Sequence, residues 1–421
     1  MPPESPFSDS VQIVSKTAEV LVLRSREELE QLRGVWAAWG GQRDSDIDFV
    51  LMIIESYPEA ERPHVICLYR DGMPDAILIG RLEKKRLPLK VGYLTLFQPE
   101  VRCLNFVYGA LRGNGSVENT ELLIRKVAQS LSSGEAELAY FELMPVESTL
   151  YTTVLGLPSA LMRDSRGPKQ LHDVMDIPES IEIIYKRMSS DRRAKTRRYI
   201  RKLEAHPEGK LSLVCYSVPD ELDRMFADAE QIARKTYQRG LNAGFSDTPA
   251  VRKRLELAAA KGWLRAYIQY LGDRPISFWI GMLYGDTFYS EYMGYDTELR
   301  SSAPGTVLLM KAIDGLCSGA RLSGVTKLDF GLGHAEYKGA LCTQSWNESA
   351  AFIFGPSFKG LLVKFLRSTT LRIDYIARRA LGSTPLLPRL KRAWRDRLAR
   401  RTSAEPHVAG QTSPGGDSEL D

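Results

Sequence analysis

The 421-residue sequence lacks the features that mark several common classes of protein. Its five cysteines are scattered and none forms a C-x-x-C pair, which argues against a disulfide framework or a cysteine zinc site and favours a reducing compartment. No apolar run approaches the roughly 18 residues that span a bilayer. The N-terminal MPPESPFSDS has no basic segment followed by an apolar core. We therefore expect a cytoplasmic protein.

Motifs of hydrolases and nucleotide hydrolases are also missing. The sequence has no G-x-S-x-G and no G-x-x-x-x-G-K-[ST], so neither a serine hydrolase elbow nor a phosphate-binding P-loop is predicted. His334 has a near-neutral intrinsic pKa but stands alone on a glycine turn without a Ser or Cys nucleophile, so it is a weak candidate base. The other histidines lie in unrelated contexts, and we expect no metal site.

What is present is the composition of a folded protein with a local basic excess. Hydrophobic residues make up 43% and charged residues 26% of the chain, whose formal net charge is +5. The segment 358–401 holds thirteen Lys or Arg against two Asp, so the remainder is mildly acidic. A second basic run, KRMSSDRRAKTRRYIRK, covers residues 186–202. The length is sufficient for two domains of ordinary size.

An internal repeat of element order is the main sign of organisation. In the second half, a strand at 210–217 precedes helices at 219–237 and 249–261, three strands, a turn, a helix from Pro304 to Ser318 and a strand containing VTKLDF. The first half repeats this order from the strand VLVLR to the strand ELAYFELM. The predicted division is a disordered segment 1–18, a degenerate first domain 19–175, a second domain 176–357 that binds the cofactor, basic amphipathic helices in 358–401 and a disordered tail 402–421.

The turn before the helix that begins at Pro304 has the properties of an anion-binding site. Pro304 suits the first helical position, and Gly305 allows a ligand to approach the backbone closely. Arg300 precedes the turn and no acidic residue follows until Asp314, so the helix dipole and the side-chain charge favour the same ligand. Ordinary helix capping explains the same residues. In the first half, Glu118 and Glu121 begin the corresponding helix and would repel a phosphate.

The motifs GYD, SAPGTVLLMKAIDGL and KLDFGLGHAEYKG resemble the acyl-CoA-binding half of GNAT-type N-acyltransferases. The closest likeness is to the branch named for cellulose biosynthesis (CelD-like acetyltransferases), which is related to the Fem aminoacyl transferases. The likeness covers roughly residues 180 to 360. It implies an α/β fold with a mixed sheet, tandem duplicated GNAT-like domains, and acetyl-CoA as acyl donor. One departure is that SSAPGT follows Arg300, where most GNAT enzymes have a Q/R-x-x-G-x-G/A loop.

The resemblance also implies roles for particular residues. Arg300 and the backbone from Pro304 through Gly305 to Thr306 would bind the CoA pyrophosphate, and the amide near Met293 would face the thioester oxygen. Tyr337 would protonate the departing thiolate. Lys338 would hold a substrate or pyrophosphate oxygen, although an exposed lysine is more often only solvated.

Two carboxylates are candidate general bases for an amine nucleophile. Glu291 lies on a strand among Tyr289, Tyr292 and Tyr295, where partial burial would raise the pKa of its carboxyl, and an exposed cross-strand carboxylate is the equal alternative. Asp329 ends the next strand and is the second candidate, although Asp before Phe-Gly is also typical of a strand-ending turn.

Three functions remain open from the sequence. The first is acyl transfer from acetyl-CoA to a small amine, such as an amino sugar for cell-surface polysaccharide. The second is a Fem-like transfer of an aminoacyl group from tRNA, but the basic run 186–202 lacks interleaved aromatics apart from Tyr199, so nucleic acid is disfavoured. The third is a non-catalytic scaffold at a membrane. Segment 358–401 mixes cations with apolar residues and Trp394, which predicts peripheral contact with the anionic inner face of a membrane.

Overall fold

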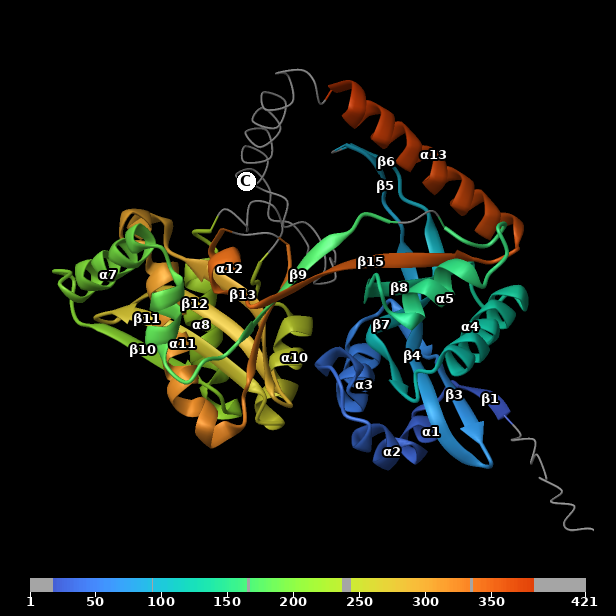
Figure 1. The fold of residues 1–421 in the computed structure, drawn as a ribbon, viewed down its shortest axis with the longest axis horizontal. Helices are drawn as coiled ribbons and strands as arrows, with labels where there is room; N and C mark the ends of the chain where they lie inside the picture. Colours follow the sequence, from blue (N-terminus) through green and yellow to red (C-terminus); the bar gives the residue numbers. More distant parts are fainter. Residues whose placement is uncertain (1–17, 93, 165–166, 237–243, 334–335, 382–421) are drawn as a thin grey trace, which may run out of the picture.

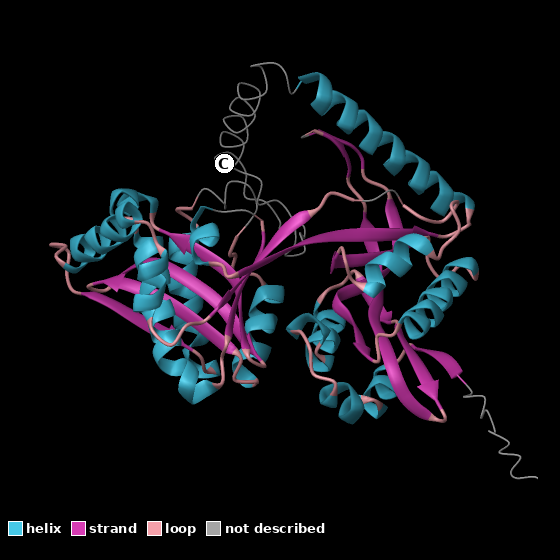
Figure 2. Cartoon of the chain, in the orientation of Figure 1, coloured by secondary structure: helices cyan, strands magenta, loops and turns pink. Residues whose placement is uncertain are grey.

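The computed structural model describes residues 18–92, 94–164, 167–236, 244–333 and 336–381. Two lobes lie side by side, each built from a twisted sheet with helices packed on it (Figures 1 and 2). The first lobe, called here the first half, contains β1 (Ala18–Leu23), α1 (Arg26–Gln31), α2 (Arg33–Ala38), η1 (Arg43–Ser45), α3 (Ile47–Ser56), β2 (Ala60–Pro63), β3 (Val65–Arg70), β4 (Met73–Arg86), β5 (Leu89–Val91), β6 (Leu94–Phe97), β7 (Glu100–Gly113), α4 (Val117–Ser132), β8 (Leu138–Pro145) and α5 (Thr149–Gly156).

The remaining elements form the second half and a C-terminal helix. The second half contains β9 (Gln170–Asp176), α6 (Ile181–Arg187), α7 (Ser190–Glu204), β10 (Leu211–Tyr216), η2 (Pro219–Glu221), α8 (Leu222–Ala233), α10 (Pro249–Ala260), β11 (Leu264–Leu271), β12 (Arg274–Tyr284), β13 (Thr287–Tyr295), η3 (Thr297–Ser302), α11 (Pro304–Ser323), β14 (Lys327–Leu332) and α12 (Glu336–Leu341). Strand β15 (Gln344–Phe354) and helix α13 (Phe358–Leu381) follow.

One mixed sheet of 13 described strands runs through both halves. Its order is β1-β3-β4-β7-β8-β15-β9-β14-β13-β12-β11-β10, with β2 paired to β4. Each half is antiparallel except for one parallel pair, β7 with β8 and β13 with β14. Read from either end, the order gives the same sequence of partners, so the duplicated α/β unit that the sequence predicts is confirmed.

The two halves exchange strands at the centre of this sheet. β9 follows the first half in sequence but pairs with β14, and β15 follows the second half but pairs with β8. β9 and β15 then pair with each other, which makes the sheet continuous (Figure 1). The sequence repeat contains no counterpart of this exchange, and the domain limits at 175/176 and 357/358 stay predictions.

Local sequence explains where the main helices begin. Ser116 caps α4 by accepting from the amide of Asn119, Asp46 caps α3, and Thr248 with Pro249 starts α10. The helix predicted at 219–237 contains α8, whose apolar face is buried where Met225, Phe226 and Ala229 contact the sheet. The described α11 continues past the predicted end at Ser318 to Ser323.

The halves also pack through helices. Phe49 and Met52 of α3 lie in the same hydrophobic cluster as Phe278 of β12, so α3 closes part of the second half's core next to α10. Tyr284 donates to Asp46 at 3.0 Å across the same boundary. The geometry of residues near this boundary therefore depends on both halves.

The predicted disordered ends fall almost wholly outside the described residues, as does the segment 382–401. Of the predicted basic helices, 358–381 is present as α13. No helix in the described part of the chain is long and apolar enough to cross a bilayer.

Candidate active site

The two parallel strand pairs part after a few residues, and each parting leaves an opening in the sheet. Thr287–Tyr289 of β13 pair with Lys327–Asp329 of β14, and the pairing stops there. In β13 the register against β12 shifts at the next position, so that Glu291 is an extra, bulged residue. Backbone groups of β13 beyond Tyr289 therefore have no β14 partner and are available to a ligand.

The first half has the equivalent opening, and here a cavity is present. β7 and β8 pair over Cys103–Phe106 and Leu138–Phe141 only. A cavity of about 250 Å³ follows, lined on one side by Gln42, Tyr108 and Gly109 and on the other by Met144 and Ser148, among others. Its described lining carries no charged side chain, so it does not attract a phosphate.

Glu291 is buried between two arginines. Its carboxylate forms an ion pair with Arg43 of η1 in the first half and another, at 2.8 Å, with Arg254 of α10. All three side chains are at least nine-tenths buried, and Arg254 also donates to the hydroxyl of Tyr292 at 2.5 Å. Glu291 lies beside the opening, but both of its carboxylate oxygens already face guanidinium groups.

Asp329 is the last residue of β14 that pairs with β13, and it is buried. Its Oδ1 accepts from the amide of Gly331 and faces Nε2 of His172, both at 2.7 Å. Among the described residues, Oδ2 has no hydrogen-bond partner. Asp329 therefore retains one carboxylate oxygen that is not committed to the fold.

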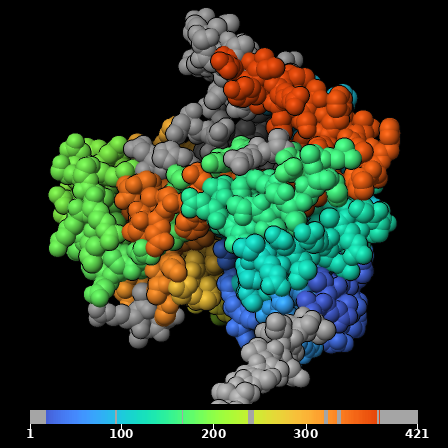
Figure 3. Space-filling view, turned by 45° about the vertical axis from the view of Figure 1, so that its right-hand side comes forward, coloured from blue at the N-terminus to red at the C-terminus, as the bar shows by residue number. Residues whose placement is uncertain are grey.

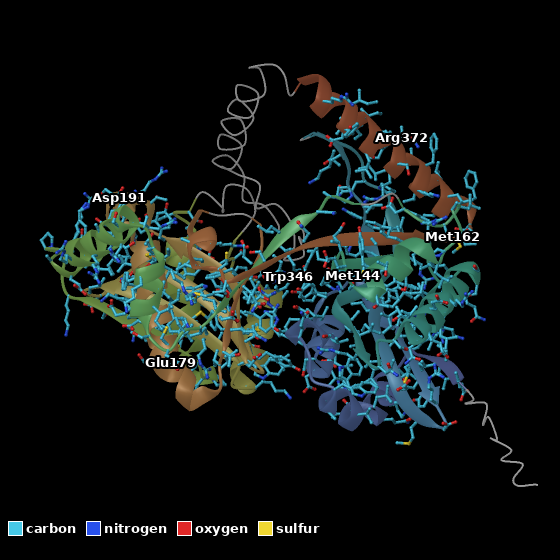
Figure 4. All side chains as sticks on the ribbon, in the orientation of Figure 1. Met144, Met162, Glu179, Asp191, Trp346 and Arg372 are labelled. Carbon is cyan, nitrogen blue, oxygen red and sulfur yellow. The ribbon has the colours of Figure 1, made fainter. Side chains whose placement is uncertain are left out.

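His172 belongs to a cluster that sequence reasoning missed. Its Nδ1 lies 3.2 Å from Oε2 of Glu348, whose Oε1 accepts from Tyr108 at 2.8 Å and from the indole of Trp346 at 2.7 Å. Figure 4 labels Trp346 where the two halves meet. The cluster's residues are far apart in sequence and come from β7, β9, β14 and β15, so no spacing in the sequence could have revealed them.

Lys338 is buried and its ammonium group is already bound. Nζ donates to the carbonyl oxygens of Leu332 at 2.7 Å, Gly333 at 3.1 Å and Gly331 at 3.5 Å. Burial lowers the pKa of this lysine, while the negative charges of Asp173 and Asp329 oppose that effect. Lys338 thus fixes the turn after β14. Tyr337 is on α12 beside it, but its side chain, like residue His334, lies outside the described residues.

The turn before α11, which the sequence predicts as an anion site, is flanked by cations. Ala303 is in the left-handed region, with φ of 47°, and its carbonyl accepts from the amides of Thr306 and Val307. The amide of Gly305 has no partner among the described residues. Arg300 is exposed, and Nζ of Lys202 from α7 reaches Ser301 at 3.3 Å, so two cations flank the turn. The acidic residues before it, Asp296 and Glu298, are neutralised by Lys235 and Arg274.

The corresponding turn in the first half has the opposite character. Ser116 caps α4 with its side chain, and Glu118 at the helix start pairs with Arg70. Asp71, Asp75 and Glu118 all line the pocket at this place, and Arg70 is its one cation. That acid disfavours a phosphate here stays a prediction. Met293, on β13, pairs with Trp279 of β12 beside the bulge.

Comparison with known proteins finds a family match for part of the chain. Residues 190–339 match the family model described as an acetyltransferase (GNAT) domain. This segment runs from α7 to α12 and contains both the opening between β13 and β14 and the turn before α11. A search of curated proteins finds no match.

One solved structure, FemX, shows a similar fold, and two further matches are given beside it. FemX matches with a TM-score of 0.53 and 11% identity, over 83% of this chain and 100% of FemX. A tandem GNAT protein from the clavulanic acid biosynthesis pathway matches with a TM-score of 0.46 and 12% identity, over 81% of this chain and 100% of that protein. A conserved protein of unknown function from Bacteroides thetaiotaomicron gives 0.47 and 13%, over 77% and 97%.

Proposed function

We propose that the protein is an acyl-CoA-dependent N-acyltransferase that moves an acetyl group from acetyl-CoA to a small amine. The observation that carries the proposal is the parting of β13 and β14 next to the cation-flanked turn of α11, both inside the GNAT domain. A pantetheine arm needs unpaired backbone groups, and a pyrophosphate needs a helix start without acidic residues. The second half offers unpaired backbone groups at the opening between β13 and β14 and a helix start without acidic residues at α11.

The residues divide the work of acyl transfer as follows. Arg300 and the amide of Gly305 hold the pyrophosphate, because the amide of Thr306 already donates to Ala303, and the amide near Met293 polarises the thioester carbonyl. The amine attacks this carbon, its proton passes to a carboxylate, and the carbon–sulfur bond breaks to release CoA thiolate. Tyr337 supplies the proton that the thiolate takes up. Lys338 acts indirectly, because it holds the turn that follows β14.

Asp329 is the better placed of the two candidate bases. Both oxygens of Glu291 face arginines, whereas Oδ2 of Asp329 is uncommitted among the described residues. Removing an operating base lowers the rate by about a hundredfold to ten-thousandfold. We expect Asp329→Asn to lose the acid limb of the pH–rate profile. If Glu291→Gln loses that limb and Asp329→Asn keeps it, the assignment is reversed. If both variants keep the limb, neither residue is the direct base.

The acceptor class follows from the resemblance to the CelD-like branch. We propose an amino sugar used in cell-surface polysaccharide, with glucosamine as the first probe. Purified protein would be incubated with acetyl-CoA and glucosamine, and N-acetylation would be followed by mass spectrometry alongside a panel of polyamines and amino acids. Acetylation of glucosamine at a higher kcat/KM than the other amines supports the proposal. A stronger preference elsewhere in the panel replaces the amino sugar.

One observation favours the Fem-like alternative, in which the donor is an aminoacyl-tRNA. The basic helix α7 packs beside α11 and η3, so its cations lie next to the proposed phosphate turn. Gel-shift titration with bulk tRNA at two salt concentrations distinguishes the donors, because phosphate contacts make binding strongly salt-dependent. Tight, salt-sensitive tRNA binding without stabilisation by acetyl-CoA would favour the alternative.

A non-catalytic scaffold is separated from both transferases by ligand stabilisation. A ligand at 100 times its dissociation constant stabilises the protein that binds it by about 2.7 kcal/mol. Acetyl-CoA should therefore raise the melting temperature of a transferase measurably. No shift with either acetyl-CoA or tRNA favours the scaffold.

We propose that helix α13 makes peripheral contact with the anionic inner face of a membrane. Val363 and Thr370 are buried, while Phe358, Phe365 and Ile376 are exposed, and the helix lies on the surface of the molecule (Figure 3). Exposed apolar residues with nearby cations, such as Lys359 and Arg372 (labelled in Figure 4), suit an anionic interface. Two other cations, Lys364 and Arg367, bond to residues 160–164 and so anchor the helix to the protein.

A further inference from the structure

A buried polar cluster lies where the two halves exchange strands. Its members come from four strands and include two carboxylates and an imidazole that are almost inaccessible to solvent: Asp329, Glu348 and His172, with Tyr108 and Trp346 around them. Burying three ionisable groups costs free energy unless they satisfy one another. Buried clusters of ionisable groups are common at functional sites, and this one lies at the edge of the proposed reaction site.

The geometry fixes the orientation of the His172 ring and places a carboxylate beside each of its nitrogens. Nε2 lies 2.7 Å from Asp329 and Nδ1 lies 3.2 Å from Glu348, so each ring nitrogen faces a carboxylate oxygen. Carboxylates only accept, and a ring that donates from both nitrogens is an imidazolium. The ring is stacked on Trp346 with centroids 4.6 Å apart and an interplanar angle of 10°, which prevents it from turning away.

The surrounding charges keep this imidazolium in place. Asp329 faces it from β14, Glu348 from β15 and the hydroxyl of Tyr108 from β7. On its own strand, Asp173 is bonded to Ser345. From α12, Lys338 lies near Asp173 and Asp329.

The charges around the imidazole and its burial shift its pKa in opposite directions. Burial alone lowers the pKa of His172, but the hydrogen bonds and charges of Asp329 and Glu348 outweigh it and raise the pKa to about 9. The ring is therefore cationic at neutral pH and becomes neutral only in alkaline solution.

Asp329 connects this cluster to the proposed reaction site. One oxygen is held by His172 and by the amide of Gly331, and this residue is the last one of β14 paired with β13. We propose that His172 is a positioning residue for acyl transfer: its imidazolium, locked by Glu348, holds the carboxylate of Asp329 at the start of the opening. The inference rests on the proposed function and adds to it a residue outside the GNAT domain match, on the exchanged strand β9.

The test compares His172→Gln and Glu348→Gln with the wild type between pH 6 and pH 10. Thiol release from acetyl-CoA with glucosamine as acceptor gives kcat and KM, and calorimetry gives acetyl-CoA affinity for each form. The wild-type rate should fall above about pH 9 as the imidazolium is lost. In Glu348→Gln this limb should move to lower pH, because a carboxylate that stabilises the imidazolium is gone.

His172→Gln cannot titrate, so it should lack the alkaline limb and show kcat reduced by at least about tenfold, with acetyl-CoA affinity unchanged. A residue that only supports the fold would alter stability without removing the limb. An alkaline limb that persists unchanged in His172→Gln overturns the proposal. So does unaltered kcat in that variant.

A second measurement keeps the inference testable if the acceptor is wrong or a variant misfolds. Titration of histidine ring signals by NMR identifies His172 as the signal missing in His172→Gln, and it requires no turnover. We expect its transition near pH 9 in the wild type and at lower pH in Asp329→Asn. A wild-type transition near the ordinary value of about 6.5, or one unmoved in Asp329→Asn, overturns the proposal. Absence of transfer by the wild type counts against the proposed function alone.

Discussion

Replacing Glu291 by Gln tests whether this carboxylate supports the fold rather than the chemistry. The side chain is 6% exposed and its partners Arg43 and Arg254 are 9% and 4% exposed, so the charges are shielded from water. Arg43 keeps Asp44 as a partner at 2.9 Å, but Arg254 keeps only the hydroxyl of Tyr292. The variant thus leaves an uncompensated guanidinium in the core next to the boundary between the halves.

Removing one partner of a buried ion pair costs about 3–5 kcal/mol. Because Gln still accepts one hydrogen bond, we expect Glu291→Gln to lower the free energy of unfolding by about 3 kcal/mol in urea titration. The matched control is Glu55→Gln, which breaks the ion pair with Arg26 in which both side chains are 56% exposed, and should cost under about 1 kcal/mol. Adding Arg254→Met to Glu291→Gln should recover part of the loss. A cost below about 1 kcal/mol for Glu291→Gln would refute the reasoning.

Two further predictions follow from the burial of His172 and the exposure of α13. Because the pKa of His172 in the folded protein lies above its ordinary 6.5, its contribution of about 3 kcal/mol to the free energy of unfolding is fully present below pH 6.5 and is lost as pH rises through about 9. The free energies of unfolding of wild type and His172→Gln, measured by urea titration, should therefore converge over this range. A difference that does not change with pH would contradict the prediction. Phe365→Ser should weaken sedimentation with anionic liposomes, while Met73→Ser, which replaces an equally exposed residue (67% for each) elsewhere, should not; equal effects would remove α13 as the contact.

The sequence predicted the local part of this architecture and missed the part that depends on distant pairing. Periodicity and turn residues identified α8, α10, the start of α11 at Pro304 and the duplicated strand order, because these depend on neighbours within a few residues. The exchange of β9 and β15 left no local trace. It joins strands separated by more than 150 residues, and only the packed sheet reveals it.

The candidate site shows the same division. Glu291 and Asp329 could be proposed from the sequence because each lies on a recognisable strand; their roles stay predictions, and the pairing of β13 with β14 ends beside them. Their partners were not predictable: Arg43 and Arg254 reach Glu291 from two different helical segments, and His172 reaches Asp329 from the exchanged strand. Lys338 was expected to meet a ligand, but in the structure its ammonium binds the carbonyls of the preceding turn.

The most direct test of the central claim asks which half binds acetyl-CoA. Gly305→Glu and Gly115→Glu place the same side chain beside the turns of the two halves, and a Cβ at either position would meet its nearest described neighbour at 3.3 Å, Tyr295 or Leu111. Calorimetric titration with acetyl-CoA should show affinity lowered by at least about tenfold in Gly305→Glu, because the carboxylate opposes a phosphate at the helix start. Gly115→Glu should bind as the wild type does. Unchanged affinity in Gly305→Glu together with a loss in Gly115→Glu would contradict the account and move the cofactor to the first half.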